Sequence, residues 1–395
     1  MPETILVVNA GSSSLKFELF EIGKDLARRV RGQIDGIGTH PHFVATDAAG
    51  KTIVNESYPP DQVDDQEKAI AHIQRTLRER LGAIVPIAIG HRVVHGGPRF
   101  SVPTAIDDAV IAQLEKLIPL APLHQPHNLA PIKAIHRNAP DVLQVACFDT
   151  AFHRAHPELA DLFAIPQSLH DEGVRRYGFH GLSYEYIASR LPQVAPDIVD
   201  GRVIVAHLGS GASMCAMVGG RSIESTMGFT ALDGLPMGTR PGQLDAGVVL
   251  YLLGEKRMDA KAIEHFLYHD CGLKGLSGIS NDVRELLASA DPRAALALDF
   301  FAYRAALLAG SLAAAMGGID GFVFTAGIGE NAPAVRDKIA QRMKWLGLEL
   351  DPIAQMGKGP LISSAESAVA CYVIPTDEEL MIGRHTLAVL RSRGR

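Results

Sequence analysis

The feature that most constrains the fold is a weak internal repeat. The first copy runs from Ile5 to Phe20 around the segment Asn9-Ala-Gly-Ser-Ser-Ser14, and the second runs from Val203 to Val218 around His207-Leu-Gly-Ser-Gly-Ala-Ser213. Each copy is an apolar run, a turn of glycine and serine, and a second strand-like run, which is the pattern of a β-hairpin. A repeated hairpin predicts a duplicated domain.

The glycine and serine turns also suggest a function. Such turns expose backbone N–H groups that suit phosphate oxygens, and glycine lets the backbone approach a ligand closely. One such hairpin is most often only a tight turn. Two copies, one in each expected domain, can hold a polyphosphate from both sides and therefore favour nucleotide binding.

Length and composition agree with a globular chain of two domains. The chain has 395 residues, more than one hydrophobic core usually supports, with 47% hydrophobic and 21% charged residues. Its net charge of -6 argues against nucleic-acid and membrane-surface partners, because these require a basic field. The N-terminus passes from Glu3 directly into a strand-like run, so no signal peptide is recognised and a cytoplasmic location is predicted.

Cysteine spacing and the apolar stretches support the same class. Four cysteines lie far apart and without a CxxC pair, which predicts reduced, mostly buried thiols and disfavours a catalytic thiolate at the first of them: Cys147, Cys215, Cys271 and Cys371. The uncharged stretch Ala305–Ile319 is shorter than the roughly 20 residues of a membrane span, so it predicts a buried helix. Val203–Gly220 is broken by glycine and serine and predicts a strand, a turn and a strand.

Strand-like and helical patterns alternate elsewhere, which indicates an α/β architecture. Residues 84–89 and Leu143–Phe148 predict buried strands, while Asp107–Ile118 and Pro292–Met316 predict helices. The proline-rich stretches 119–131 and 192–196 predict loops. The C-terminal segment predicts a strand over Val369–Ile374 and an amphipathic helix over Asp377–Arg395.

The segment Phe322–Ala332 matches a dinucleotide-binding fingerprint. It consists of a strand-like run and a G-x-G-x-x-A turn, with Asp351 closing a later strand-like run. The segment lies late in the chain, after both phosphate hairpins. A turn that holds the adenosine of a nucleotide is therefore favoured over an NAD site.

Charged residues stand at the ends of several apolar runs. His91 and His95 are four residues apart, but the segment lacks the glutamate of HExxH and lies in a β-type run, so zinc is rejected. Arg92 follows the strand expected at 84–89, where it either points into a cleft or forms a surface salt bridge. Asp149 ends a buried strand, the place where open α/β sheets bind ligands. Arg240 lies in a glycine-rich loop.

Several segments, taken in order along nearly the whole chain, resemble the acetate kinase family: Asn9–Lys16, His91–Gly97, Phe148–His153, Arg176–Gly181, Gly238–Arg240, Phe324–Asn331 and Thr376–Leu380. The resemblance implies an α/β fold of two duplicated actin-like (ribonuclease H-like) domains flanking a nucleotide cleft. The domains would be 1–152 plus 378–395, and 153–377. The second would bind the nucleotide and dimerise, and closure about a hinge between the two would exclude water.

The resemblance also implies a reaction. The γ-phosphoryl of ATP would pass reversibly to acetate by direct in-line displacement, giving acetyl phosphate and ADP. The cofactor would be Mg²⁺ or Mn²⁺, with ATP or ADP as co-substrate, and the partners a small carboxylate and a second copy of the chain. A carboxylate is already ionised near pH 7, so the chemistry needs positioning and charge neutralisation rather than a strong base.

The resemblance assigns the site residues by role. Arg92 and Arg240 would hold the carboxylate and the transferring phosphoryl, His180 would stabilise the equatorial oxygens, and Asp149 completes the catalytic set. The substrate would contact Arg92 and His124, with an apolar patch of Val94, Leu123 and Phe179 around its acyl tail. The metal would be organised by Asn9, Asp149 and Glu378. The nucleotide and its phosphates would contact Asn9, Ser12, Ser14, Lys16, His207, Gly209, Ser210, Gly211, Asn281, Asp282, Arg284, Gly327, Ile328, Gly329 and Asn331.

The chain departs from the family pattern at four places. The family usually has asparagine where this chain has Ser210 and Gln125, Thr-Pro where it has Thr230-Ala231, and Gly-Asp-Ile-Asp-Pro where it has Gly242-Gln-Leu-Asp-Ala246. The change at Ser210 bears on affinity for the phosphoryl donor. The change at Ala231 enlarges the acyl pocket, and a pocket discriminates one methylene by only ~1–3 kcal/mol.

Three alternatives remain at this stage. A propionate or butyrate kinase would use the same chemistry with a roomier pocket. An actin-like ATPase module would bind ATP for conformational switching and would have no use for paired arginines facing a carboxylate. An NAD-dependent oxidoreductase would rest on Gly327–Ala332.

Overall fold

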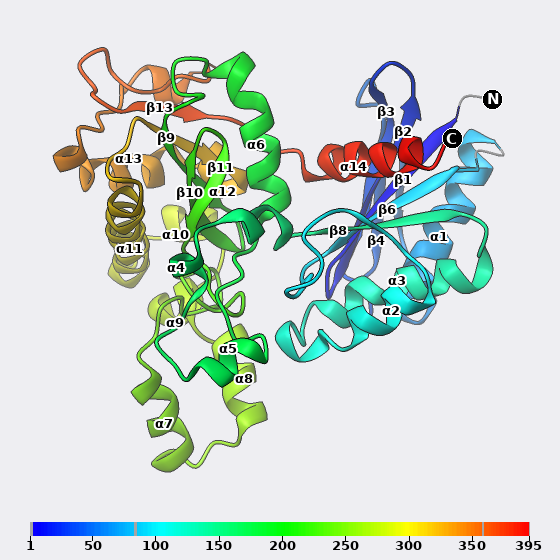
Figure 1. The fold of residues 1–395 in the computed structure, drawn as a ribbon, viewed down its shortest axis with the longest axis horizontal. Coiled ribbons are helices and arrows are strands. Elements are labelled where there is room, and N and C mark those ends of the chain that lie inside the picture. The colour runs from blue at the N-terminus through cyan, green and yellow to red at the C-terminus, as the bar shows by residue number, and fades with distance from the viewer. Residues whose placement is uncertain (1–2, 83–84, 358, 395) are drawn as a thin grey trace. The chain divides into compact units, whose positions relative to one another are not determined.

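The computed structural model describes residues 3–82, 85–357 and 359–394. The chain forms two compact units (Figure 1). Unit 1 is Met1–Ala151 with Asp377–Arg395, so the C-terminal segment returns to the N-terminal part of the chain. Unit 2 is Phe152–Thr376.

The described part of unit 1 is built on a sheet of eight strands in the order β5-β4-β3-β2-β1-β6-β8-β7. Strands β1, β2 and β3 pair antiparallel, and β6 and β8 follow β1 in parallel. The strands are β1 Thr4–Ala10, β2 Ser14–Ile22, β3 Leu26–Asp35, β4 His42–Asp47, β5 Thr52–Ser57, β6 Ala88–Val93, β7 Thr104–Ala105 and β8 Leu143–Phe148.

Unit 2 repeats the central part of this topology. Its described sheet has the order β11-β10-β9-β12-β13, with an antiparallel first half and a parallel second half. The strands are β9 Arg202–Leu208, β10 Ala212–Val218, β11 Arg221–Ser225, β12 Gly321–Thr325 and β13 Ala370–Val373. Strand order and direction match β3-β2-β1-β6-β8, so the repeated hairpins belong to a repeated sheet.

Helices cover both faces of each sheet (Figure 1). In unit 1, α14 packs on β1, β6 and β8, while α1 and α3 share a core with the side chains of the other face. In unit 2, α6 packs through Tyr184, Ile187 and Leu191 on one face, and α11 contacts β9 and β10.

The helices are α1 Gln66–Leu81, α2 Asp108–Glu115, α3 Gln125–Asn138, α4 Glu158–Asp161, α5 Gln167–Asp171, α6 Gly181–Val194, α7 Ala246–Gly254, α8 Ala260–His269, α9 Gly272–Ser277, α10 Val283–Ala288, α11 Pro292–Met316, α12 Ala326–Asn331, α13 Pro333–Gln341 and α14 Glu378–Ser392. Aspartate caps begin several of them, since a carboxylate accepts hydrogen bonds from the otherwise unpaired N–H groups of the first turn. Asp65, Asp107, Asp291 and Asp377 do so for α1, α2, α11 and α14.

Several predicted elements are confirmed, and three are corrected. Both hairpins, the strand at 143–148 and the helix at 292–316 have the expected bounds or nearly so. The strand expected at 84–89 is β6, Ala88–Val93, so Arg92 lies within the strand; residues 83–84 are outside the described part. Neither proline-rich stretch is simply a loop. Helix α3 begins inside the first, with Pro126 in its first turn, and α6 continues through Pro192.

Helix α11 is the one described helix long and apolar enough to cross a membrane by length and composition. Half of its most apolar window is buried in the protein, and the core helix of a soluble protein passes the same test. Its buried face carries Leu308 and Leu312, as expected for the apolar run 305–319, and also Phe301 before that run.

Candidate functional site

Two hydrogen bonds hold the first phosphate turn, Gly11 to Ser13, in unit 1. The N–H of Gly11 donates to the Ser14 carbonyl at 2.8 Å, and the Gln66 side chain of α1 donates to the Gly11 carbonyl at 2.6 Å. Ser12 remains exposed, and Asn9 lies opposite Lys16 across the hairpin. The turn is therefore held at its base while its tip and Lys16 face solvent.

Arg92 and Asp149 form an ion pair at the ends of two parallel strands. The Arg92 Nη2 lies 2.6 Å from Asp149 Oδ2, and its Nε lies 3.1 Å from both carboxylate oxygens. Asp149 is almost fully buried, whereas Arg92 is partly exposed. Parallel strands β6 and β8 end at the same sheet edge, which explains why these two residues meet.

Acidic and amide oxygens surround this ion pair. Arg92 Nη1 donates to Asn9 Oδ1 at 3.3 Å, and Arg92 Nε lies 4.0 Å from Glu378 Oε2. The amide of Asn9 donates to Glu379 Oε1 at 3.0 Å. Burial, together with the neighbouring Asp149 and Glu379 carboxylates, raises the pKa of Glu378 to about 7 against the opposing effect of Arg92. All three predicted metal-site residues, Asn9, Asp149 and Glu378, thus gather around Arg92.

Of the predicted substrate-binding residues of unit 1, Val94 lies beside Arg92 in sequence, whereas Leu123 and His124 belong to a separate segment. Val94 is buried directly after β6, and its N–H donates to the Asn128 amide oxygen at 2.9 Å. Leu123 and His124 are half-buried at the start of α3. The remaining predicted acyl contact, Phe179, belongs to unit 2, where it is buried.

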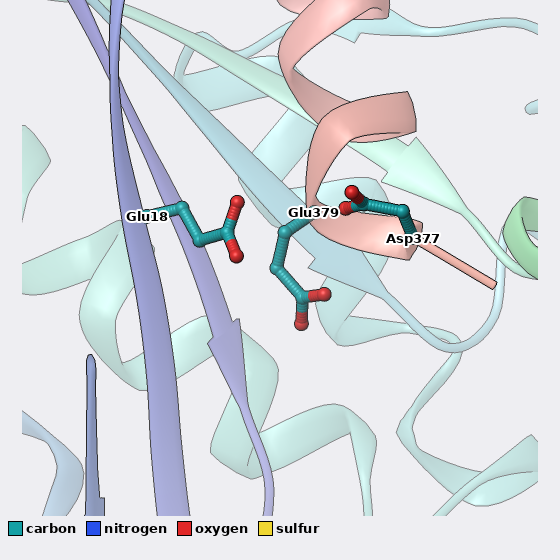
Figure 2. Close-up of side chains that lie close together, drawn as sticks. All are labelled: Glu18, Asp377 and Glu379. Carbon is teal, nitrogen blue, oxygen red and sulfur yellow. The ribbon is translucent and has the colours of Figure 1, made fainter. Parts of the chain in front are cut away.

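Two further carboxylates lie close to that of Glu379 near the start of α14. Figure 2 shows Glu18 on β2 with Asp377 and Glu379, and one oxygen of each lies within 4.8 Å of the others. Arg28 donates to Glu18 and to Asp377, both at 2.7 Å. Burial nevertheless raises the pKa of Glu18 to about 7. Arg28 already neutralises part of the charge that would attract a cation here.

The second phosphate turn, Gly209 to Gly211, brings two predicted catalytic residues together in unit 2. A methyl group on Gly211 would lie 2.9 Å from Arg240 Nη2 and 3.2 Å from His180 Nε2. Arg240 is anchored from behind, because its Nη1 donates to the Ala231 carbonyl at 2.7 Å. A guanidinium and an imidazole therefore converge on the turn from two different loops.

His180 is oriented by its neighbours. Its Nδ1 is 2.7 Å from the Ser213 hydroxyl of β10, and its ring stacks on the ring of His207 with centroids 4.2 Å apart. The Nδ1 of His207 in turn lies 2.9 Å from the Ser183 hydroxyl. Ser183 and Ser213 were not predicted, because a buried serine carries no sequence signal that separates it from a packing residue.

Beyond the turn lies a cavity of about 470 Å³ in unit 2. Most of the predicted adenosine-side residues line it, together with Gly209 and Ser210 of the phosphate turn: Asn281, Asp282, Arg284, Gly327, Ile328 and Asn331. Sequence reasoning missed four others, Gly238, Val283, Leu287 and Ala332. Leu287 is an exposed apolar residue on the short helix α10, and only the fold shows that it lines the cavity.

Gly329 and Arg284 differ from the other predicted adenosine-side residues. Gly329 is buried within α12 and is not part of the cavity lining. Arg284 lines the cavity, but its guanidinium pairs with Asp282 at 2.5 Å and is mostly exposed. The G-x-G-x-x-A segment itself forms a helix, α12, that directly follows β12.

Fold and cavity together define a class. Two sheets of matching topology, each opening with a glycine–serine hairpin, and a nucleotide-sized cavity beside the second hairpin are the architecture of the actin-like, sugar-kinase-like phosphotransferases. Within that class, the model of the Acetokinase family matches residues 4–384, and the chain belongs to this family.

Known proteins with similar sequences and structures support this family assignment. An acetate kinase from Nitrobacter hamburgensis is 59% identical over 394 residues, which cover 99% of this chain and 97% of that protein. The crystal structure of Porphyromonas gingivalis acetate kinase has a TM-score of 0.86 and 36% identity, covering 98% and 100% of the two chains. A propionate kinase from Francisella tularensis has a TM-score of 0.91 and 35% identity, covering 98% and 99%.

Proposed function

We propose that the chain is an enzyme that transfers the γ-phosphoryl of ATP reversibly to acetate, giving acetyl phosphate and ADP by direct in-line displacement. The observation that carries the proposal is the convergence of Arg240 and His180 on Gly211, next to the cavity lined by Gly209 and Ser210. Two cationic or hydrogen-bonding groups at the phosphate end of a nucleotide cavity suit transfer of a phosphoryl group.

Each of the proposed catalytic residues would bind one of the negatively charged groups in the reaction. Arg240 and the Nε2 of His180 would hold the equatorial oxygens of the transferring phosphoryl, since both already point at the second phosphate turn. Arg92, kept in place by Asp149, would hold the acetate carboxylate through its planar fork. Acetate is ionised near pH 7 and needs no general base, so positioning supplies most of the rate.

The oxygen donors of unit 1 fit a divalent cation. Asn9, Asp149 and Glu378 offer amide and carboxylate oxygens, the ligands that Mg²⁺ and Mn²⁺ accept in proteins. Burial first, and then the neighbouring Asp149 and Glu379 carboxylates, raise the pKa of Glu378, and a bound cation would favour its ionised form. When bound, the cation would neutralise charge on the nucleotide phosphates.

Acetate is the proposed acyl substrate because the chain is 59% identical to an acetate kinase. A propionate kinase shares its fold at 35% identity, so the fold itself does not choose the acid. The apolar contacts proposed for the acyl tail are Val94, Leu123 and Phe179. A pocket separates acids that differ by one methylene by only about 1–3 kcal/mol, so the ranking of acids must be measured.

We further propose that unit 2 forms a homodimer in the cytoplasm through an exposed apolar surface. On α11 the side chains of Leu296, Phe300, Tyr303 and Leu307 follow one helical stripe and are all exposed. Trp345 is 71% exposed and its ring lies beside Gly310 of the same helix. Contiguous exposed apolar residues of this kind commonly mark a protein interface, and a second copy of the chain would cover them.

The test of the reaction is a hydroxamate assay. Purified protein is mixed with MgATP, hydroxylamine and acetate, propionate, butyrate or no acid. We expect an acid-dependent hydroxamate that is largest with acetate and that falls at least about 100-fold in Arg240→Ala. The exposed Arg221 of β11 provides a matched control, and Arg221→Ala should leave the rate unchanged.

Other outcomes of this assay would contradict specific parts of the proposal. A preference for butyrate would refute acetate as the substrate. ATP hydrolysis that added carboxylate does not affect would favour an actin-like ATPase module. Dimerisation is tested separately by light scattering of Phe300→Glu, which should be monomeric if the α11 surface is the interface; an unchanged mass would place the interface elsewhere.

A further inference from the structure

His180 has an uncommon backbone conformation. Its φ of 57° and ψ of 24° lie in the left-handed region, which residues other than glycine rarely adopt. It stands immediately before α6, where no side chain of its own caps the helix. A non-glycine residue persists in such a conformation only when surrounding contacts hold it there, and such residues gather at functional sites.

Two consecutive side chains hold the segment that precedes His180. The Nε2 of His153 lies 3.0 Å from the Phe179 carbonyl, and its Nδ1 lies 2.8 Å from the Ser222 hydroxyl. A carbonyl oxygen can only accept, so Nε2 carries the hydrogen and Nδ1 accepts from Ser222. Complete burial lowers the pKa of His153 to about 3, which keeps the ring neutral and this arrangement intact.

The next residue, Arg154, holds two more carbonyls of the same segment. Its Nη2 donates to the carbonyls of Arg176 and Tyr177, both at 3.0 Å, while its Nη1 donates to Asp161 at 3.0 Å. The guanidinium also lies over the Tyr177 ring, 5.0 Å from its centroid. Its side chain is only 10% exposed, so these bonds are shielded from competing water.

Gly178 shows how closely the segment is fitted. It has a φ of +72°, and a methyl group there would lie 2.6 Å from the His153 ring. The backbone therefore passes directly against the imidazole. Three of the four carbonyls before His180, those of residues 176, 177 and 179, are held by His153 and Arg154.

We propose that His153 and Arg154 are positioning residues that hold His180 in its left-handed conformation. In that conformation Nδ1 of His180 meets Ser213 and Nε2 lies beside Gly211 and Arg240. The inference rests on the proposed function in so far as His180 acts on the phosphoryl group. The side chains of the pair are buried or nearly so and bond the backbone carbonyls that precede His180, so both act through His180 rather than on the substrate.

The first experiment is a double-mutant cycle. His153→Gln and Arg154→Lys are made in the wild-type chain and in His180→Ala, with kcat and KM for ATP measured by hydroxamate formation. We expect each single variant to lower kcat at least about tenfold with KM changed less than about twofold, and to have little further effect once His180 is absent. Equal losses in both backgrounds, or an unchanged kcat, would overturn the proposal.

The second experiment needs no catalysis. With isotope-labelled histidine, the ring resonance of His180 is assigned by its loss in His180→Gln. Both variants should shift this resonance, whereas replacement of the exposed His265 by Gln should not. An unmoved His180 resonance in both variants contradicts the positioning role even if the chain forms no acyl phosphate. Absence of hydroxamate from the wild-type chain would contradict only the proposed function.

Discussion

Gly211 offers a direct test of the second phosphate turn. Gly211→Ala adds one methyl group between two predicted catalytic side chains. That methyl would lie 2.9 Å from Arg240 Nη2, where ordinary contact begins at about 3.4 Å, so the guanidinium must retreat by about 0.5 Å. His180 Nε2, at 3.2 Å, must retreat by about 0.2 Å.

The structure indicates which property of the protein should suffer. Only the far ends of two side chains meet the methyl, so the folded state should lose less than about 1 kcal/mol of stability. Arg240 cannot retreat freely, because its Nη1 is bonded to the Ala231 carbonyl at 2.7 Å. Since a misplacement of 1 Å can lower a rate about 100-fold, we expect kcat to fall about 10- to 100-fold, equivalent to about 1.4–2.7 kcal/mol in the barrier.

The assay is hydroxamate formation at saturating ATP and acetate, with thermal unfolding measured on the same samples. Gly254→Ala at the end of α7 is the matched control, because a methyl group there meets no atom within 4 Å. It should leave both kcat and stability near the wild-type values. A Gly211→Ala enzyme with full kcat would show that Arg240 and His180 do not act at this turn.

Three further predictions concern unit 1. Burial raises the pKa of Glu18 to about 7 in the folded chain, against the ordinary value of 4.5 in the unfolded chain. The free energy of unfolding should therefore fall by up to about 3 kcal/mol as the pH rises from about 4.5 to 7. Urea unfolding of Glu18→Gln at several pH values should lack this decrease. Arg92→Lys keeps the charge but loses the fork to Asp149, so acetate turnover should fall at least about tenfold, while Arg99→Lys on the surface should be neutral. Gly90→Ala would place a methyl 2.2 Å from the Thr386 hydroxyl under α14 and should lower the unfolding free energy by about 1–3 kcal/mol in a denaturant titration; an unchanged midpoint would refute this packing.

The sequence predicted the parts of the fold that depend on local pattern. Apolar β-branched runs on both sides of a glycine–serine turn specify a hairpin with little help from the rest of the chain, and both hairpins are present. The long helix Pro292–Met316 could also be predicted from local pattern, because it begins with an aspartate cap and a proline and ends at a glycine. The repeat alone did not specify the order of the strands, which depends on the pairing of β6, β8, β12 and β13.

What the sequence did not predict depends on contacts far apart in the chain. The sequence pattern placed Arg92 after its strand, but pairing with β8 extends β6 to Val93. Pro131 and Pro192 suggested loops, yet tertiary packing keeps α3 and α6 helical through them. The sequence assigned no role to His153 of the Phe148–His153 segment, because the Phe179 carbonyl that it holds lies 26 residues further along the chain.

The departures from the family pattern differ in what they touch. Ala231 supports Arg240 through its backbone carbonyl, which the change of side chain leaves in place. Gln125 uses its longer amide to bridge the backbone of His95 and Leu114 in the buried start of α3. Gln243 accepts from Arg304 of α11 and lies outside the cavity lining. Ser210 alone of these four lines the nucleotide cavity, and its side chain is exposed there. Of these four departures, Ser210 is therefore the one expected to change the affinity for the phosphoryl donor.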